Sequence, residues 1–180
     1  MTEINIVLTQ TNTKVSKMLK IFSKKPYNHV SISMNSDCST MYSFGRKVIW
    51  CPLIGGFVKE DINEGIFKLF PETKCKIYKI DVTDAEYDTI LVRLDKFIAD
   101  PDKYKYSFLN LFLMYFNIPL TRKYCYVCSS FVTDILWGIV SLEKEVTLVA
   151  PDDYNNLKLE TVYEGKLHSY VNGKVAYNNI

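Results

Sequence analysis

His29 and Cys128 are the two side chains of this 180-residue chain whose types and positions best suit nucleophilic catalysis. The chain has only two histidines, so an imidazole base must be His29 or His168. His29 begins a run in which polar and apolar residues alternate, which predicts a strand with Ser31 and Ser33 on the same face. These small neighbours would leave the imidazole accessible. The alternative for His29 is a structural role, and His168, in a polar stretch of the tail, is interpreted as a surface residue.

Cys128 lies in the first turn of a predicted amphipathic helix over residues 126–140. The unpaired backbone N–H groups and the dipole at a helix start favour the thiolate, which is the reactive form of cysteine. The same N–H groups could form part of an oxyanion hole. With an imidazole base nearby, such a thiolate attacks the carbonyl carbon of an amide, ester or thioester. The alternative is that Cys128 is a small buried apolar residue.

Cys125 and Cys128 also form a C-x-x-C motif, which raises two further interpretations. A zinc site needs two more ligands at a partner spacing, and the other cysteines, Cys38, Cys51 and Cys75, are isolated. A thioredoxin-like redox site is expected after the first strand of a βαβ unit, whereas this motif follows a predicted helix. We therefore expect no metal and no cofactor, and keep a C-x-x-C thiol-redox protein as the third functional alternative.

Other motifs that carry chemistry are absent or incomplete. There is no G-x-S-x-G motif of the kind that presents a serine nucleophile. The two glycines at 55–56 are not followed by the Lys-Ser/Thr ending of a phosphate-binding loop. The paired carboxylates at 60–61 and 152–153 have no third group beside them. We interpret them as solvated or capping residues rather than acid–base pairs.

Composition limits the class of protein. The formal net charge is +2, which does not suggest a nucleic-acid-binding protein. The N-terminus lacks the pattern of a signal peptide, and the longest apolar stretch, 108–120, is shorter than the about 20 residues of a transmembrane helix. The odd number of cysteines, five, is typical of reduced thiols. We expect a cytoplasmic protein with a single domain over residues 1–180 and no transmembrane segment.

The elements that position these side chains follow from hydrophobic periodicity and turn signals. Their order (hairpin, strand, helices, strands) predicts an α+β fold. Residues 46–70, with Pro52 and the two glycines, predict an irregular excursion, and Thr83 to Glu86 form a capping box. The expected strands are 4–8, 29–34, 40–44, 75–82, 159–162 and 167–171. The expected helices are 13–22, 84–100, 107–116 and 126–140, with a short turn or helix at 151–157.

The segments around the two candidate residues resemble a known family. Residues 28–34 (NHVSISM) and 126–132 (YVCSSFV) are similar to the anchoring motifs of circularly permuted papain-fold cysteine hydrolases. These are YaeF/YiiX-like relatives of the NlpC-type amidases and of lecithin retinol acyltransferase. In this group the histidine strand precedes the cysteine helix, as it does here. The resemblance covers residues 25–140 and implies an antiparallel sheet or partial barrel packed against helices.

The resemblance implies that Cys128 is the nucleophile and His29 the general base. The family has a third polar residue on the strand after the histidine, but no His, Glu, Asn or Gln lies between Thr40 and Lys47. Period-two alternation puts Ser43 on the face of His29, so Ser43 is the candidate that orients the imidazole. The alternatives for that role are Tyr42 and Glu60. The further candidates for substrate binding or the oxyanion hole are Tyr42, Tyr126, Arg46 and Glu60.

The predicted function is therefore a thiol hydrolase, an amidase, peptidase or acyltransferase, whose partner is a small-molecule, peptide or acyl substrate. The alternative is a non-catalytic binding domain that retains a papain-like groove. The Tyr- and Phe-rich stretch 104–120 could line a lipid-accepting groove, but apolar residues at helical spacing usually form core, and we interpret the stretch as core.

Overall fold

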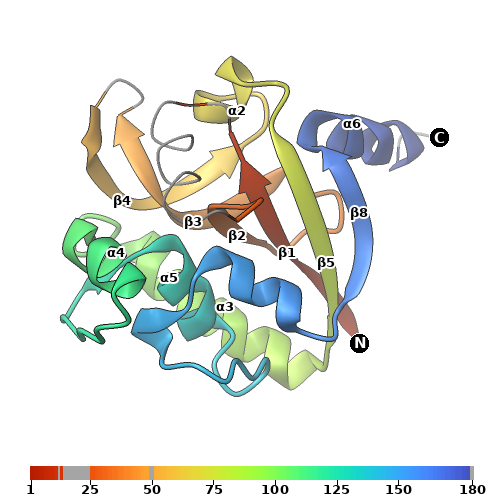
Figure 1. Ribbon diagram of the computed structural model, residues 1–180. Helices are drawn as coiled ribbons and strands as arrows, with labels where there is room; N and C mark the ends of the chain where they lie inside the picture. The colour runs from red at the N-terminus through yellow and green to blue at the C-terminus, as the bar shows by residue number, and fades with distance from the viewer. Residues whose placement is uncertain (12, 14–24, 49–50, 179–180) are drawn as a thin grey trace.

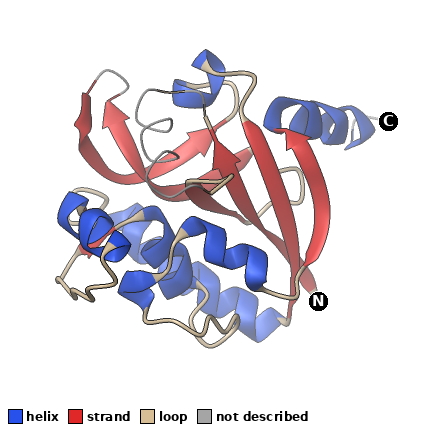
Figure 2. Ribbon diagram, viewed as in Figure 1, coloured by secondary structure: helices blue, strands red, loops and turns tan. Residues whose placement is uncertain are grey.

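The computed structural model describes residues 1–11, 13, 25–48 and 51–178. In these ranges an eight-stranded sheet, in the order β7-β6-β4-β3-β2-β1-β5-β8, is packed against helices, so the fold class is α+β as predicted. Figures 1 and 2 show a strongly curled sheet with α3, α4 and α5 below it and α2 and α6 at its upper rim. All neighbouring strands are antiparallel except β6 and β7, which are parallel.

The bounds of the elements are as follows. The strands are β1 (Thr2–Gln10), β2 (His29–Ser33), β3 (Thr40–Val48), β4 (Cys51–Asp61), β5 (Lys74–Val82), β6 (Lys105–Tyr106), β7 (Cys125–Tyr126) and β8 (Glu160–Lys166). The helices are α2 (Gly65–Leu69), α3 (Asp84–Ala99), α4 (Phe108–Tyr115), α5 (Cys128–Ile135) and α6 (Leu167–Asn178), with 3-10 turns at Val146–Leu148 and Pro151–Asn156.

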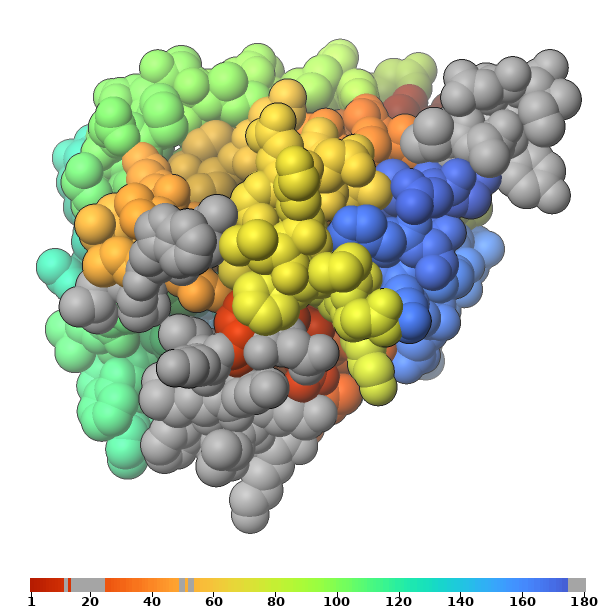
Figure 3. Space-filling model, turned by 90° about the horizontal axis from the view of Figure 1, so that it is seen from above, coloured from red at the N-terminus to blue at the C-terminus, as the bar shows by residue number. Residues whose placement is uncertain are grey.

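The two faces of the sheet carry two separate apolar clusters. Alternate residues of the central strands, such as Val30, Ile32 and Phe44, point to one face and pack against α3 and α5. On the other face a smaller cluster includes Met41, on β3, and residues of α2 and α6. Figure 3 shows this side from above, where the yellow segment that carries α2 lies next to the blue α6. His29 begins β2 at the rim of this second face.

Most of the expected elements are confirmed. The hairpin of β2 and β3 pairs Ile32 with Tyr42, and β5 covers the strand predicted at 75–82. The capping box at the start of α3 is present, because Thr83 accepts from the Glu86 N–H while the Glu86 carboxylate accepts from the Thr83 N–H. The helix predicted at 107–116 is α4. The helix predicted at 13–22 lies outside the described residues, apart from Thr13.

The prediction of an irregular excursion at 46–70 is wrong, because most of it is the 11-residue strand β4, which pairs with β3. The glycines that indicated a loop make room for β6. A Cβ at Gly55 would lie 2.8 Å from Cβ of Tyr106 and 3.0 Å from the carbonyl oxygen of Gly45. Glycine in a strand often marks such a close approach.

Two further boundaries differ from prediction. Residues 167–171 are the first turn of α6 rather than a strand, and they bury Leu167, Tyr170 and Val171 at helical spacing. Five residues are too few to distinguish the helical period from the strand period. The helix predicted at 126–140 is shorter, because α5 ends at Ile135 and Gly138 follows with a φ of 81°. Within the described ranges, no helix is both long and apolar enough to cross a bilayer.

The close approach at Gly55 predicts a stability effect. We expect Gly55→Ala to lower the free energy of unfolding by about 1–3 kcal/mol, because the methyl group overlaps Tyr106 and strand backbone that cannot move aside. Gly173→Ala is the control, since a Cβ there meets no atom within 4 Å and alanine suits a helix. Urea unfolding followed by circular dichroism measures both. Equal midpoints for Gly55→Ala and the unmodified protein would contradict the packing described.

Candidate active site

His29 on β2 and Glu60 on β4 are in contact across the strand between them, β3. The two outer strands do not pair with each other, and the contact passes over a position of β3 that has no side chain. Gly45 lies on β3 at the meeting point. A Cβ there would be 3.6 Å from Oε1 of Glu60 and 3.8 Å from Cε1 of His29. A side chain much larger than alanine would therefore enter the space through which Glu60 reaches His29 across β3.

The imidazole of His29 is held by a buried polar network. Its Nε2 lies 2.9 Å from Oε1 of Glu60, 3.0 Å from Oγ of Ser43 and 3.3 Å from Oγ of Ser31. Ser31 also donates to Oε2 of Glu60 at 2.6 Å. The Glu60 carboxylate therefore accepts from His29 and from Ser31, and the Glu60 side chain is only 10% exposed. Because Nε2 has a single hydrogen, these contacts leave Nδ1 as the ring nitrogen that is available on the other side.

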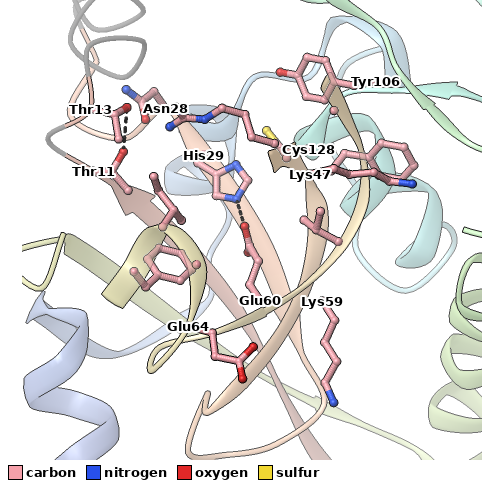
Figure 4. Close-up of a pocket in the computed structure, with 18 of the residues that line it drawn as sticks. Thr11, Thr13, Asn28, His29, Lys47, Lys59, Glu60, Glu64, Tyr106 and Cys128 are labelled. Carbon is pink, nitrogen blue, oxygen red and sulfur yellow. Dashed lines mark hydrogen bonds and ion pairs between the residues drawn. The ribbon is translucent and has the colours of Figure 1, made fainter. Parts of the chain in front are cut away.

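Cys128 occupies that other side. It is the first residue of α5, it is 5% exposed, and it lines the same pocket as His29. Figure 4 shows the His29 ring with Glu60 at one edge and Cys128 beyond the opposite edge. The N-cap of α5 is Val127, and its N–H donates to Oγ of Ser130 at 3.0 Å, which fixes the start of the helix. The first N–H groups of α5 therefore lie beside the sulfur without intrahelical partners.

The surroundings of His29 favour its protonated form. Burial lowers the pKa of His29, but the charge of Glu60 and hydrogen bonds to Cys128 and Glu60 outweigh it and raise the pKa from 6.5 to about 10. The imidazolium therefore persists at neutral pH. Because the pKa is higher in the folded than in the unfolded chain, this pairing stabilises the fold fully below pH 6.5 and ceases to do so above about 10.

The pocket around these residues has a volume of about 420 Å³. Tyr106, on β6, lies on the Cys128 side of it (Figure 4). Burial raises the pKa of Tyr106, and the negative charge of Cys128 raises it further, so the phenol stays protonated and can donate a hydrogen bond. Arg46 also lines the pocket, and desolvation lowers the pKa of its guanidinium. Among the described residues Arg46 forms no ion pair with a carboxylate.

The structure brings some of the predicted site residues together and leaves others apart. Ser43 lies on the face of His29, as the alternation predicts, and contacts its ring. Arg46 lines the pocket, whereas Tyr42 lies on the other face of the sheet and stacks on Phe57 at 6.1 Å between ring centres. Tyr126 packs against Phe44 in the core cluster and donates its hydroxyl to Asp134, so it does not line the pocket.

The interpretation of Glu60 as a solvated or capping residue is wrong, because its carboxylate is buried against His29. Glu60 was predicted only as an alternative for the orienting role, because residues 46–70 did not predict a strand. Once β4 is known, period two places Glu60 on the same face as Val58, which pairs with Ser43. Tyr106 and Gly45 were not among the predicted site residues. Both act through contacts between strands that are distant in sequence, and a single sequence carries no local signal for them.

The remaining cysteines and His168 lie away from this site. Cys125 is on β7, opposite Lys105, and all five cysteines are free. The part of the chain that the structure describes contains no group of three or more His, Cys, Asp or Glu side chains that could hold a metal ion. His168, interpreted from the sequence as a surface residue, is instead partly buried on α6, where its Nδ1 has no hydrogen-bond partner among the described residues.

Comparisons of the chain with protein-family models, with curated proteins and with solved structures find no significant match.

The contact between Glu60 and His29 predicts a change in titration. We expect Glu60→Gln to lower the pKa of His29 from about 10 by more than one unit, because the largest contribution that raises it is the Glu60 charge. Ser43→Ala is the matched comparison and should change the pKa far less, since a hydroxyl orients the ring without carrying charge. Proton NMR titration of the Cε1 hydrogen measures this, with His168→Gln used to assign the two histidine signals. Equal shifts in both variants would contradict a dominant role for the carboxylate.

Proposed function

We propose that this protein is a thiol hydrolase or acyltransferase that acts on an amide, ester or thioester bond. The observation that supports the proposal is a buried chain of three groups, in which Glu60 holds one edge of the His29 ring and Cys128 lies at the other. In this arrangement Cys128 is the nucleophile and His29 the base, while the carboxylate stabilises the imidazolium. Glu60 thus takes the orienting role, with Ser43 assisting it.

In the first step the thiolate of Cys128, whose proton Nδ1 of the His29 imidazolium already carries, attacks the carbonyl carbon of the substrate. The C–S bond forms while the carbonyl π electrons move to oxygen. The N–H of Cys128, at the start of α5, and the hydroxyl of Tyr106 are the donors we assign to that oxyanion. Arg46 is assigned to a negatively charged group of the substrate, because the described residues offer it no carboxylate.

In the second step the imidazolium gives its proton to the departing amine, alcohol or thiol as the tetrahedral intermediate collapses to a thioester on Cys128. Formation of the thioester removes the negative charge of Cys128, which is one of the causes that raise the pKa of His29. The pKa of His29 therefore falls in the acylated protein, and the ring can accept a proton from water or another acceptor. That molecule then attacks the thioester and releases the acyl group.

The order of the elements supports a permuted papain-like fold as part of this proposal. The histidine strand β2 comes early, the cysteine helix α5 comes late, and α5 packs directly against β2 and β3. The curled, mostly antiparallel sheet beside that helix supports this part of the proposal, because the resemblance implies an antiparallel sheet or partial barrel. A non-catalytic binding domain and a C-x-x-C redox protein are the outcomes against which the proposal is tested.

We expect iodoacetamide to alkylate Cys128 at least tenfold faster than Cys125 at pH 7, although Cys125 is the more exposed thiol. The cause is the imidazolium of His29, so His29→Ala should slow Cys128 by about tenfold or more and leave Cys125 unchanged. Peptide mass spectrometry after timed labelling measures each rate.

His168→Ala is the control for loss of an imidazole elsewhere. Equal labelling of Cys125 and Cys128 would favour the non-catalytic domain. Loss of Cys128 reactivity in Cys125→Ser, with His29→Ala unchanged, would favour redox chemistry. Either result overturns the hydrolase proposal.

A further inference from the structure

The eight-residue helix α4 turns its most apolar face to solvent. Positions 108, 109, 112, 115 and 116 lie on one side of a helix with 3.6 residues per turn. All five are large and apolar or aromatic, with exposed fractions from 39% to 61%. They form a continuous stripe, which we call the α4 face: Phe108, Leu109, Phe112, Tyr115 and Phe116. The rings of Phe112 and Phe116 pack on each other at 4.8 Å.

The side of α4 that faces the protein carries a polar residue, Asn110. Asn110 is buried, shares a hydrogen bond with Ser107, and donates its amide to the carbonyl of Leu120 at 2.7 Å. Met114 is buried beside it. The interpretation of residues 104–120 as core is therefore wrong for the outer half of α4. A soluble helix normally has the opposite arrangement, and a contiguous exposed apolar surface marks an interaction site.

The segment that carries the α4 face is basic, and Asp102, which directly precedes it, is paired with Lys47. From residue 103 to residue 133 the chain contains four basic residues and no Asp or Glu. The parallel pairing of β6 and β7 brings the basic residues before and after α4 together. Lys103 and Lys123 both lie against the ring of Tyr124, at 4.6 and 4.9 Å. Aromatic residues beside lysines are typical of segments at the boundary between lipid headgroups and hydrocarbon.

We propose that the α4 face docks on an anionic lipid bilayer, with its phenylalanines inserted at the headgroup boundary and the neighbouring lysines and arginine against lipid phosphates. The combination of exposed Phe side chains with the lysines around Tyr124 fits anionic lipid better than it fits a second copy of this chain, in which the same lysines would face one another. In this proposal the protein lies on the surface of the bilayer, and none of the described helices is both long and apolar enough to span it.

Docking through the α4 face would bring the pocket close to the lipid. Phe108 and Leu111 of α4 line the same pocket as Cys128, so α4 is both a wall of the pocket and the docking element. In Figure 1 this helix lies at the edge of the molecule, away from β8 and α6. The docking proposal rests on the surface alone and holds whether or not Cys128 is a nucleophile.

Co-sedimentation of the full chain with vesicles tests the proposal. We expect binding to vesicles of phosphatidylcholine and phosphatidylglycerol, and at least tenfold weaker binding to phosphatidylcholine alone. Phe112→Asp should reduce binding to the anionic vesicles by tenfold or more, because it places a charge in the inserted stripe. Lys103→Gln and Lys123→Gln should each reduce it by about fivefold at low salt. Val92→Asp, at an apolar position of α3 that is just as exposed, is the control and should bind normally.

Circular dichroism of each variant and its reaction with iodoacetamide at Cys128 show whether the fold and the candidate active site are intact. Failure of the proposed function would leave vesicle binding unchanged, and failure of docking would leave Cys128 reactivity unchanged. Equal binding of Phe112→Asp and the unmodified chain would overturn the proposal. A second result would also overturn it: no vesicle binding, together with a dimer in sedimentation velocity that Phe112→Asp dissociates. The α4 face would then join two copies of this chain.

Discussion

The hydrogen bond between Glu60 and His29 is the interaction on which the rest of the site depends. A buried carboxylate is costly unless it is paired and fully hydrogen-bonded. Here the imidazolium supplies the charge and Ser31 supplies a second donor. The pairing requires an open space on the strand between them, which Gly45 leaves. The same carboxylate keeps His29 protonated next to Cys128, so the geometry of the sheet sets the protonation state of the site.

The helix side of the site is held both by its own hydrogen bonds and by packing on the sheet. Ser130 caps α5, Ser129 donates to the carbonyl of Val149, and Thr133 bonds to Tyr154, so the helix is anchored by buried hydroxyls along its length. Its apolar stripe packs on β2 and β3 through residues such as Phe131. Cys128 is therefore held at the start of a rigid element and faces a ring that is held by another. Preorganisation of this kind is what nucleophilic catalysis requires, because no energy is spent on orienting the groups during reaction.

Local patterns were sufficient to predict much of this arrangement. The strict alternation after His29 predicts β2, the capping box predicts α3, and the periodicity after residue 128 places Cys128 at a helix start. The alternation of side chains along a strand also predicts correctly that Ser43 and His29 lie on the same face of the sheet. Contacts between distant strands were not predictable. Gly55 and Gly56 locally indicate a loop, but their role is to make room for β6. Because of this error Glu60 was also interpreted as solvated, and only as an alternative partner of His29. The outward apolar face of α4 was missed because periodicity identifies an amphipathic helix but does not say which side is covered.

The central claim is that Cys128 accepts an acyl group under the control of His29 and Glu60. Intact-protein and peptide mass spectrometry after brief exposure to p-nitrophenyl acetate tests it most directly. The account predicts an acetyl thioester on Cys128, removable by neutral hydroxylamine, absent in Cys128→Ser and formed at least tenfold more slowly in His29→Ala. Acetylation confined to lysines, or acetylation of Cys125 and Cys128 at equal rates with no dependence on His29, would contradict it.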